Sequence, residues 1–214
     1  MKLALSSRLM GIEQLIIFVK APRPGSVKTR LAEAIGPNEA CAAYRTLVET
    51  VLGKLSALDS VVLRFAPDDA AAEILPWRRA RWQTQPQGPG DLGQRLESAF
   101  RDSFKAGAQR VVIIGSDCPA VTATDVRAGW AALETQDVVL GPASDGGYWL
   151  IGLRECRREL FEGIPWSTDE VLARTLQRAE AAKWRVHLLR ELADVDTETE
   201  WKDFLAGTAA ETTE

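Results

Sequence analysis

The sequence predicts a three-layer α/β/α fold built on a mostly parallel sheet. Short, continuous apolar runs rich in β-branched residues occur at 15–19 and 111–114, and such runs are typical of strands buried on both faces. Segments of ten or more residues with helical spacing of their apolar positions alternate with these runs. The 214 residues contain no internal repeat, low-complexity tract or linker that would divide the chain. We therefore expect one α/β domain.

The expected elements follow one another in a regular order. Strands are expected at residues 15–19, 61–66, 111–115, 138–140, 148–153 and 186–189. Helices are expected at 31–55, with a break at Gly36-Pro37, and at 92–106, 124–133, 168–182 and 198–205. The helix at 92–106 is preceded by a polar stretch at 83–93, and Ser167 or Thr168 is expected to cap the helix at 168–182. We expect a flexible N-terminal lead at 1–12, a single domain at 13–206 and a polar tail at 207–214.

Composition narrows the class of protein. Hydrophobic residues make up 46% of the chain and charged residues 26%, as in ordinary globular proteins. The net charge of -4 does not suggest a nucleic-acid partner, so an anionic ligand has to be held by a local positive cluster and a metal ion. Three widely spaced cysteines without a CxxC pair favour a reducing compartment. No apolar run approaches the ~20 residues of a membrane span. We therefore expect a cytoplasmic protein.

Charged residues follow several of the expected strands. In open α/β sheets ligands bind outside the carboxyl ends of the strands. A basic loop that begins with Lys20 follows the first strand, and Asp117, Asp145 and the pair Asp194 and Asp196 follow three later ones. Because parallel strands present these ends on one rim, the sequence predicts that cations and carboxylates converge there.

The basic loop after the first strand is a candidate phosphate site. Gly25 and Ser26 free backbone N–H groups just before a helix, at whose start Lys28 and Arg30 lie. Two cations at a helix start oppose the helix dipole unless an anion is present, and a phosphate would resolve that conflict. The loop matches neither the Walker A pattern nor GxGxxG. The alternative is a solvated, basic helix start.

Two aspartates are candidate ligands of a divalent cation. Asp117 ends a buried strand and Asp196 lies beyond a later one. Their hard oxygens suit Mg²⁺ or Mn²⁺, which bridge substrate phosphates and keep several waters. Asp194 is an alternative ligand or a support for the ligands. The structural alternatives are a turn made by Asp117 and capping of the last helix by Asp194, Asp196 or Thr197.

Two glycine-containing segments are further candidates for ligand contact. In the run Asp145-Gly146-Gly147 the glycines allow close approach or positive φ, and the aspartate is a candidate for binding an acceptor hydroxyl, acting as a base or joining the metal shell. A tight turn is the equal alternative. The segment that contains Gly90, Asp91 and Gly93 is expected to contact a base or ribose through its backbone, with Asp91 capping the next helix in either case.

Nucleophilic and zinc chemistry are poorly supported. His187 is the one histidine and lies within an expected apolar strand, so a Ser-His-Asp or Cys-His enzyme is not indicated. The cysteine and histidine spacing does not fit a zinc site. Cys118 is expected to be a small buried thiol.

Six motifs in order carry a resemblance to a known family. They are KAPRPGSVKTRLAEAIG, GDLGQRL, GSDCPAVT, GPASDGGYWLIGL, IPWST and DVDTETEW, between about residues 13 and 206. The chain resembles a bacterial family of GT-A-like transferases, known as a domain of unknown function and as radical SAM/selenodomain-associated transferase 1. It is more distantly similar to molybdenum cofactor guanylyltransferase and 2-phospho-L-lactate guanylyltransferase.

The resemblance implies the nucleotide-diphospho-sugar transferase (GT-A-like) fold and assigns roles to individual residues. It implies phosphate binding by Lys20, Gly25, Lys28 and Arg30. It also implies that Asp117 binds the metal.

The second metal ligand is implied by a later motif. The aspartate of the DTPEDL-like motif of sugar-activating cytidylyltransferases matches Asp196, with Thr199 where proline usually stands. Together, the residues and the resemblance make Lys28, Asp117 and Asp145 the candidates for the reaction itself.

Two enzymatic functions are compatible with these expectations. In the first, a nucleotide-sugar donates its sugar to a small-molecule acceptor of unknown identity. In the second, a phosphorylated acceptor attacks the α-phosphate of a nucleoside triphosphate and releases pyrophosphate. The sequence and its resemblance lean towards sugar transfer, while the basic loop suits the extra charge of a triphosphate. A nucleotide-binding module without turnover is the third alternative.

Overall fold

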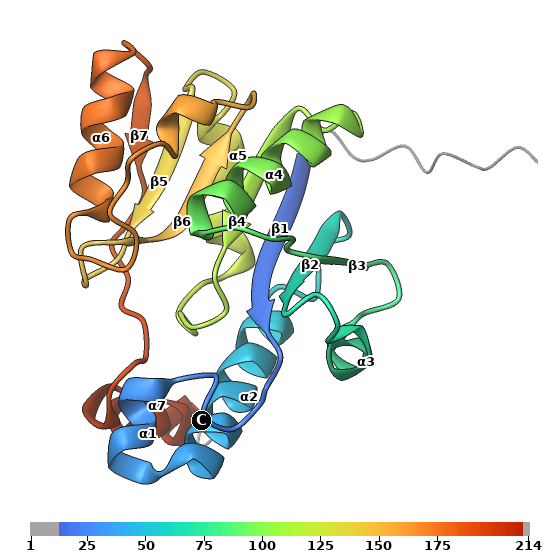
Figure 1. Ribbon diagram of the computed structural model, residues 1–214, viewed down its shortest axis with the longest axis vertical. Helices are drawn as coiled ribbons and strands as arrows, with labels where there is room; N and C mark the ends of the chain where they lie inside the picture. Colours follow the sequence, from blue (N-terminus) through green and yellow to red (C-terminus); the bar gives the residue numbers. More distant parts are fainter. Residues whose placement is uncertain (1–12, 212–214) are drawn as a thin grey trace, which may run out of the picture.

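The computed structural model describes residues 13–211 and contains a twisted sheet of seven strands in the order β3-β2-β1-β4-β6-β5-β7 (Figure 1). β6 runs antiparallel to both of its neighbours, and the other pairs are parallel. The strands are β1 Glu13–Lys20, β2 Val61–Ala66, β3 Gln83–Pro86, β4 Arg110–Ile114, β5 Val138–Pro142, β6 Tyr148–Leu153 and β7 Val186–Leu188. The predicted mostly parallel sheet is confirmed.

Helices cover both faces of the sheet. They are α1 Thr29–Ile35, α2 Pro37–Lys54, α3 Ala71–Ile74, α4 Leu92–Lys105, α5 Ala123–Ala132, α6 Val171–Ala181 and α7 Glu198–Glu211, with short 3₁₀ helices η1 at Leu75–Trp77 and η2 at Arg158–Leu160. Alternate residues of β1 point to opposite faces: Leu15 and Ile17 pack in the cluster that includes α2 and α5, and Ile16 packs in the cluster of α4 and α6. Burial on both faces explains why this strand is continuously apolar.

A small helical unit lies beyond the carboxyl end of β1. Leu31 of α1 and Ala40 of α2 are fully buried there, and Trp201 of α7 packs against them. Figure 1 shows α1 and α7 side by side at the lower end of the molecule. The last helix therefore returns the end of the chain to the loop that follows β1.

The structure corrects several expected boundaries. The polar stretch 83–93 contains the strand β3, which lies at the sheet edge and needs no apolar pattern because its residues are only half-buried. α6 begins at Val171 rather than at residue 168, because Ser167 has a left-handed backbone and the Thr168 hydroxyl donates to Pro165 O instead of capping the helix.

The predictions for the two ends of the chain have different outcomes. α7 continues to Glu211, into the segment 207–214 that was expected to be a polar tail. The expected N-terminal lead at 1–12 lies outside the described residues. Within residues 13–211, no helix has the length and apolar character to cross a membrane.

Candidate functional site

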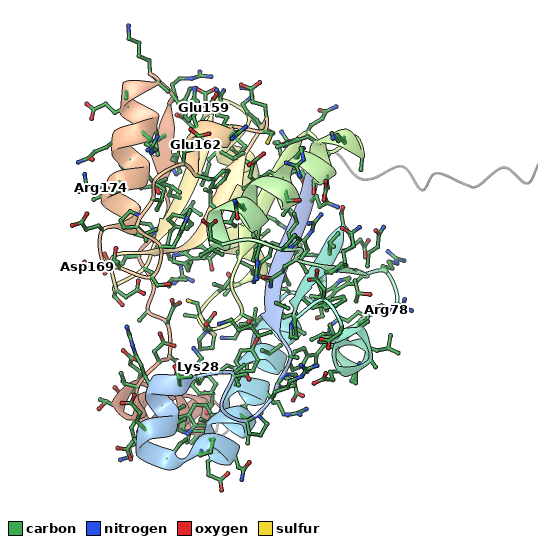
Figure 2. The ribbon with its side chains drawn as sticks, in the orientation of Figure 1. Lys28, Arg78, Glu159, Glu162, Asp169 and Arg174 are labelled. Carbon is green, nitrogen blue, oxygen red and sulfur yellow. The ribbon has the colours of Figure 1, made fainter. Side chains whose placement is uncertain are left out.

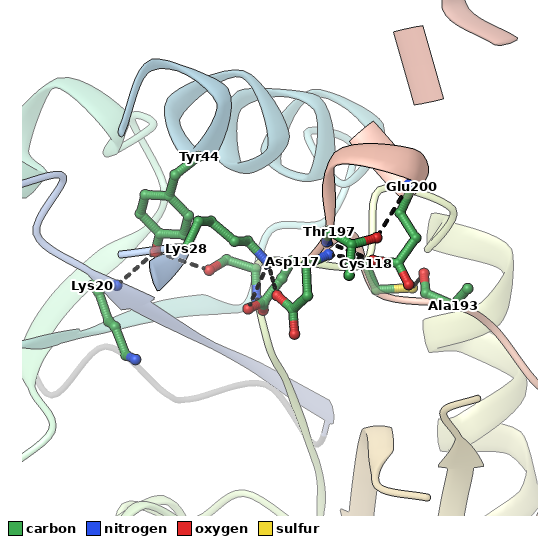
Figure 3. A network of polar contacts seen from close by, with 10 residues as sticks. Lys20, Lys28, Tyr44, Asp117, Cys118, Ala193, Thr197 and Glu200 are labelled. Atoms are coloured by element: carbon green, nitrogen blue, oxygen red, sulfur yellow. Dashed lines mark hydrogen bonds and ion pairs between the residues drawn. The ribbon is translucent and has the colours of Figure 1, made fainter. Parts of the chain in front are cut away.

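The carboxyl ends of β1 and β4 meet the segment that precedes α7. β1 pairs with β4 in parallel, so Lys20 and Ser116-Asp117 follow neighbouring strands at the same end of the sheet. The segment before α7 is tied to this end, because Val195 N donates to Asp117 O at 3.1 Å. Topology thus brings together three parts of the chain that the sequence singled out (Figure 3).

Lys28 joins the two candidate metal ligands. Its Nζ lies 2.6 Å from Asp196 Oδ1 and 3.2 Å from Asp117 Oδ2; Lys28 and Asp117 are labelled in Figure 3. The Lys28 side chain is 2% exposed, whereas those of Asp117 and Asp196 are 44% and 39% exposed. The ammonium therefore lies on the inner side of a carboxylate pair whose outer oxygens face solvent.

This contact shows which anions face the basic loop in the free protein. A cation at a helix start is expected to need an anionic partner, and for Lys28 two carboxylates supply it. Burial alone lowers the pKa of Lys28, and the attraction of Asp117 and Asp196 outweighs burial and raises it. Arg30 keeps the expected character: it is exposed and forms no ion pair with any described residue.

Tyr44 connects the ends of the two strands and was not identified from the sequence. Its hydroxyl accepts from Lys20 N at 2.8 Å and lies 3.1 Å from Ser116 Oγ. The backbone N–H of Ser116 in turn donates to Asp117 Oδ1 at 3.1 Å. Burial raises the pKa of Tyr44 to about 12, so the hydroxyl stays neutral. On the apolar face of α2 this tyrosine has the sequence pattern of a core residue.

Glu200 holds the backbone around Asp196. Its carboxylate accepts from Asp196 N at 2.7 Å and from Thr197 N at 2.8 Å, and Thr197 Oγ1 accepts from Glu200 N at 3.4 Å. This reciprocal pattern is a capping box for α7. Thr197 thus serves the capping role, and the Asp196 side chain is left for Lys28.

A third carboxylate adds negative charge to this region. Burial raises the pKa of Asp194 to about 7, and the charges of Asp117, Asp145 and Asp196 contribute to the shift, while Lys28 opposes it. The carboxylates that the sequence placed after separate strands therefore lie close enough to interact electrostatically.

Two adjoining cavities open at this rim. The smaller, about 300 Å³, is lined by Lys20, Val27, Lys28, Thr29, Arg30, Tyr44, Asp117, Ser167 and Asp196. The larger, about 410 Å³, is lined by Arg30, Leu92, Asp145, Gly147, Tyr148, Trp166, Ser167, Thr168, Asp169, Val171, Asp194 and Asp196. They share Arg30, Ser167 and Asp196. We call them the basic cavity and the acidic cavity.

The Asp145-Gly146-Gly147 run forms a tight turn at the wall of the acidic cavity. Asp145 Oδ1 accepts from Gly147 N at 2.9 Å. Gly146 has a φ of 86°, and a Cβ there would collide with the backbone of Asp169, which belongs to the loop labelled in Figure 2. The run therefore forms the tight turn that was the alternative to ligand contact. Asp145 and Gly147 nevertheless line the acidic cavity.

The other predicted contact residues lie beside the cavities. Gly25, at a φ of 78°, and Ser26 form the turn before Lys28. Asp91 caps α4 as expected, and its side chain accepts from Gln94 N. Gly93 packs against the Trp166 ring. Of these residues and Gly90, none lines either described cavity, although the neighbouring Leu92 does.

The side chains at the rim fit one divalent cation held by two carboxylates. Both Asp117 and Asp196 reach a single cationic atom, the Lys28 Nζ, so they already converge on one positive centre. Carboxylate oxygens are the ligands that Mg²⁺ and Mn²⁺ prefer. Among the described residues no group of three or more histidine, cysteine, aspartate or glutamate side chains is arranged to hold a metal ion. A cation here would depend on phosphate and water for its remaining ligands.

Cys118, next to Asp117, is not poised for nucleophilic chemistry. Burial raises the pKa of its thiol to about 12, and nearby Asp194 adds to the shift. Its Sγ lies 3.4 Å from Ala193 O. The thiol is thus a buried packing group that also touches the segment before α7.

The sequence and the fold are similar to those of known proteins. Residues 50–168 match the model of a family described as uncharacterized protein conserved in bacteria (DUF2064). A protein from Desulfovibrio desulfuricans G20, assigned as a nucleotide-diphospho-sugar transferase, superposes with a TM-score of 0.82 and 35% identity over 88% of this chain and 84% of that one.

Two further proteins are similar to this chain, one in sequence and one in fold alone. Phosphoenolpyruvate guanylyltransferase of Sphaerobacter thermophilus is 32% identical over 130 residues, which are 59% of this chain and 61% of the relative. The match therefore spans about three fifths of that protein. The CMP:2-keto-3-deoxy-manno-octonic acid synthetase solved with CTP has a TM-score of 0.58 at 12% identity over 93% of this chain and 99% of that one, a likeness of fold alone.

Proposed function

We propose that this chain, which belongs to the DUF2064 family, is a nucleotidyltransferase that uses a nucleoside triphosphate. An acceptor oxygen attacks the α-phosphorus, a new P–O bond forms, the bond between the α-phosphorus and the bridging oxygen breaks, and pyrophosphate leaves. Nucleotide transfer by the Sphaerobacter relative favours this reaction over sugar transfer, and its name makes guanine the base to test first.

The observation that carries the proposal is the composition of the basic cavity. Lys20, Lys28 and Arg30 supply three positive charges beside the carboxylates of Asp117 and Asp196. Such an alternation of charges suits a metal-bound triphosphate, whose reaction depends mainly on positioning and on neutralising developing charge. Mg²⁺ or Mn²⁺, held by the two aspartates, would neutralise the triphosphate and the departing pyrophosphate.

The chain's own residues have distinct parts in this reaction. Lys20 and Arg30, which both line the basic cavity, neutralise phosphate oxygens. Arg30 also borders the acidic cavity, so it lies where the reacting phosphate and the acceptor meet. Asp145, which also lines that cavity, has a carboxylate available to orient an acceptor hydroxyl or to accept its proton.

A direct assay separates this function from its alternatives. The full chain is incubated with each nucleoside triphosphate, Mn²⁺ and a set of acceptors that includes phosphoenolpyruvate and sugar phosphates, and pyrophosphate is measured. We expect pyrophosphate release that depends on acceptor and metal and is lost in Asp117→Asn. Release of a nucleoside diphosphate from UDP- or GDP-sugars, without pyrophosphate from triphosphates, would establish sugar transfer instead. Nucleotide binding without either product would indicate a binding module.

The second candidate, sugar transfer, is favoured by one observation. The relative with 35% identity is assigned as a nucleotide-diphospho-sugar transferase. The acidic cavity has room for a sugar beside the phosphates and offers Trp166 and several carboxylates to it. The two functions share the metal and the basic cavity and differ in which bond of the donor breaks.

A further inference from the structure

Lys28 occupies the place between the two carboxylates where a divalent cation would bind. Its Nζ is within 2.6 Å and 3.2 Å of Asp196 and Asp117, on the inner side of the pair. The 2% exposure of its side chain means that water does not screen this charge. The free protein therefore already has a positive group at the centre of its candidate metal site.

The backbone holds Lys28 in this place. Lys28 has a φ of 48° and a ψ of 50°, a left-handed conformation that residues other than glycine adopt infrequently. It directly precedes α1, whose Leu31 is fully buried and anchors the helix. The Lys28 side chain is therefore aimed at Asp117 and Asp196 by a fixed backbone, not by a flexible surface loop.

A free divalent cation has to compete with this ammonium. Two positive charges at one carboxylate pair repel each other strongly where water is excluded. If the ammonium leaves without a new partner, it loses the carboxylates that offset its burial. Divalent cations alone should therefore bind poorly to the free protein.

A nucleotide removes this conflict. Lys28 also lines the basic cavity, together with Lys20 and Arg30. Phosphate groups in that cavity give the ammonium new anionic partners within reach of a side-chain rotation, and the carboxylates then become free for the cation. The metal and the phosphates thus each favour the binding of the other.

We propose that Lys28 couples metal binding to nucleotide binding, acting as a resident counter-ion that the carboxylate pair exchanges for a divalent cation only when phosphates arrive. This inference rests on the proposed function for the nature of the nucleotide. It concerns the order and coupling of binding, which the chemistry of nucleotidyl transfer does not require.

The decisive measurement is the affinity of the free protein for Mn²⁺, by electron paramagnetic resonance, in wild type and in Lys28→Met. Removal of the competing ammonium should increase Mn²⁺ affinity about tenfold or more. Lys20→Met is the matched control: Lys20 lines the same cavity without contacting the carboxylates, so free-protein Mn²⁺ affinity should stay within about twofold. Unchanged or weaker Mn²⁺ binding in Lys28→Met would overturn the proposal.

A measurement on the wild-type protein covers the case in which Lys28→Met does not fold. The NMR signals of lysine labelled with ¹³C at Cε are recorded, and that of Lys28 is assigned with Lys28→Arg, which keeps the charge. Mg²⁺ alone should leave the Lys28 signal in place, whereas Mg²⁺ with the α,β-methylene analogue of GTP should move it. Equal movement with Mg²⁺ alone, or no movement once the analogue is shown to be bound, would contradict the exchange. Because the Mn²⁺ comparison needs no nucleotide, failure to bind GTP would count against the proposed function alone.

Discussion

The basic and acidic cavities share a wall but differ in how their charges are arranged. In the basic cavity, Lys28 is already paired with Asp117 and Asp196 through contacts of 3.2 and 2.6 Å. In the acidic cavity, Asp145 is engaged only by its own turn, and Asp169 has no ion pair among the described residues. In the free protein the carboxylates of the basic cavity are paired with a cation, whereas Asp145 and Asp169 of the acidic cavity have no cationic partner among the described residues.

This contrast indicates where reaction chemistry and substrate choice reside. Charged groups placed beside the reacting phosphate stabilise a transition state by neutralising the charge that develops there. A wall with unengaged polar groups and an aromatic side chain is better suited to selecting a ligand by shape and hydrogen bonding. We therefore expect substitutions in the basic cavity to affect the rate most, and those in the acidic cavity to affect the acceptor.

The largest expected effect is that of Asp117→Asn. It removes one of the two carboxylates available to the metal, and we expect kcat to fall about 10²–10³-fold, as on loss of one charge-stabilising group. Pyrophosphate release measures this effect. Asp145→Asn is the comparison variant, because Asn can keep the contact with Gly147 N, and it should mainly raise the KM for the acceptor. If Asp145→Asn lowered kcat as much as Asp117→Asn, the proposed division between the cavities would be wrong.

The next effect is on nucleotide affinity. Arg30→Ala should weaken nucleotide binding by about 1.5–3 kcal/mol, about tenfold or more, through loss of a charge-assisted hydrogen bond. The melting temperature should stay the same, because Arg30 is exposed and has no ion pair among residues 13–211. Calorimetric titration and thermal unfolding test both statements, with Arg81→Ala, which pairs with Asp59 outside both cavities, as control. A less stable variant with normal affinity would show that Arg30 is a structural residue.

The third effect is on stability and concerns the wall of the acidic cavity. Gly146→Ala adds a Cβ at a φ of 86° where the backbone of Asp169 leaves no room, and we expect a loss of about 2 kcal/mol or more in the free energy of unfolding. Gly25→Ala is the matched control: its φ is 78°, but nothing lies within 4 Å of the added Cβ. It should lose only about 1 kcal/mol. Equal losses in urea unfolding would mean that the contact with Asp169 is unimportant.

The sequence was informative where local pattern decides structure. The apolar run of β1, the break between α1 and α2 at Gly36 and the capping of α4 by Asp91 all follow from short-range rules, and each is confirmed. The edge strand β3 was missed because Gln83-Thr84-Gln85 carries no apolar signal; its pairing with β2 defines it. α6 starts late because Thr168 bonds within its own turn.

The site was less predictable because its contacts are distant in sequence. Lys28 meets carboxylates 89 and 168 positions away, so its pairing could not be read from its position before a helix. Tyr44 shares a helical pattern with core residues, and its partner Ser116 is 72 positions away. The rule that ligands bind outside the carboxyl ends of the strands located the region of the site. Which charged side chains pair there depends on the tertiary structure.

The smallest expected effect concerns the segment that carries Asp194 and Asp196 to the site. Arg190, between β7 and Asp194, binds Asp125 of α5 through two contacts of 2.7 Å, and Asp125 also forms a capping box with Thr122. Burial tends to raise the pKa of Asp125, but the hydrogen bonds from Arg190 and Thr122 outweigh it and lower the pKa. The ion pair therefore links the segment that leads to Asp194 and Asp196 to α5.

Since the pKa of Asp125 is lower in the folded than in the unfolded protein, its stabilisation is complete above the unfolded value of about 3.9 and disappears as the pH falls through the folded value. Asp125→Asn keeps the side-chain shape and the acceptor for the α5 cap but loses the charge. The variant should be less stable by about 0.5–1 kcal/mol at pH 7, because Arg190 is half exposed, and the difference should shrink below about pH 4. Urea unfolding between pH 3 and 7 measures it. A difference that persisted unchanged at pH 3 would show that the charge of Asp125 is not what stabilises this segment.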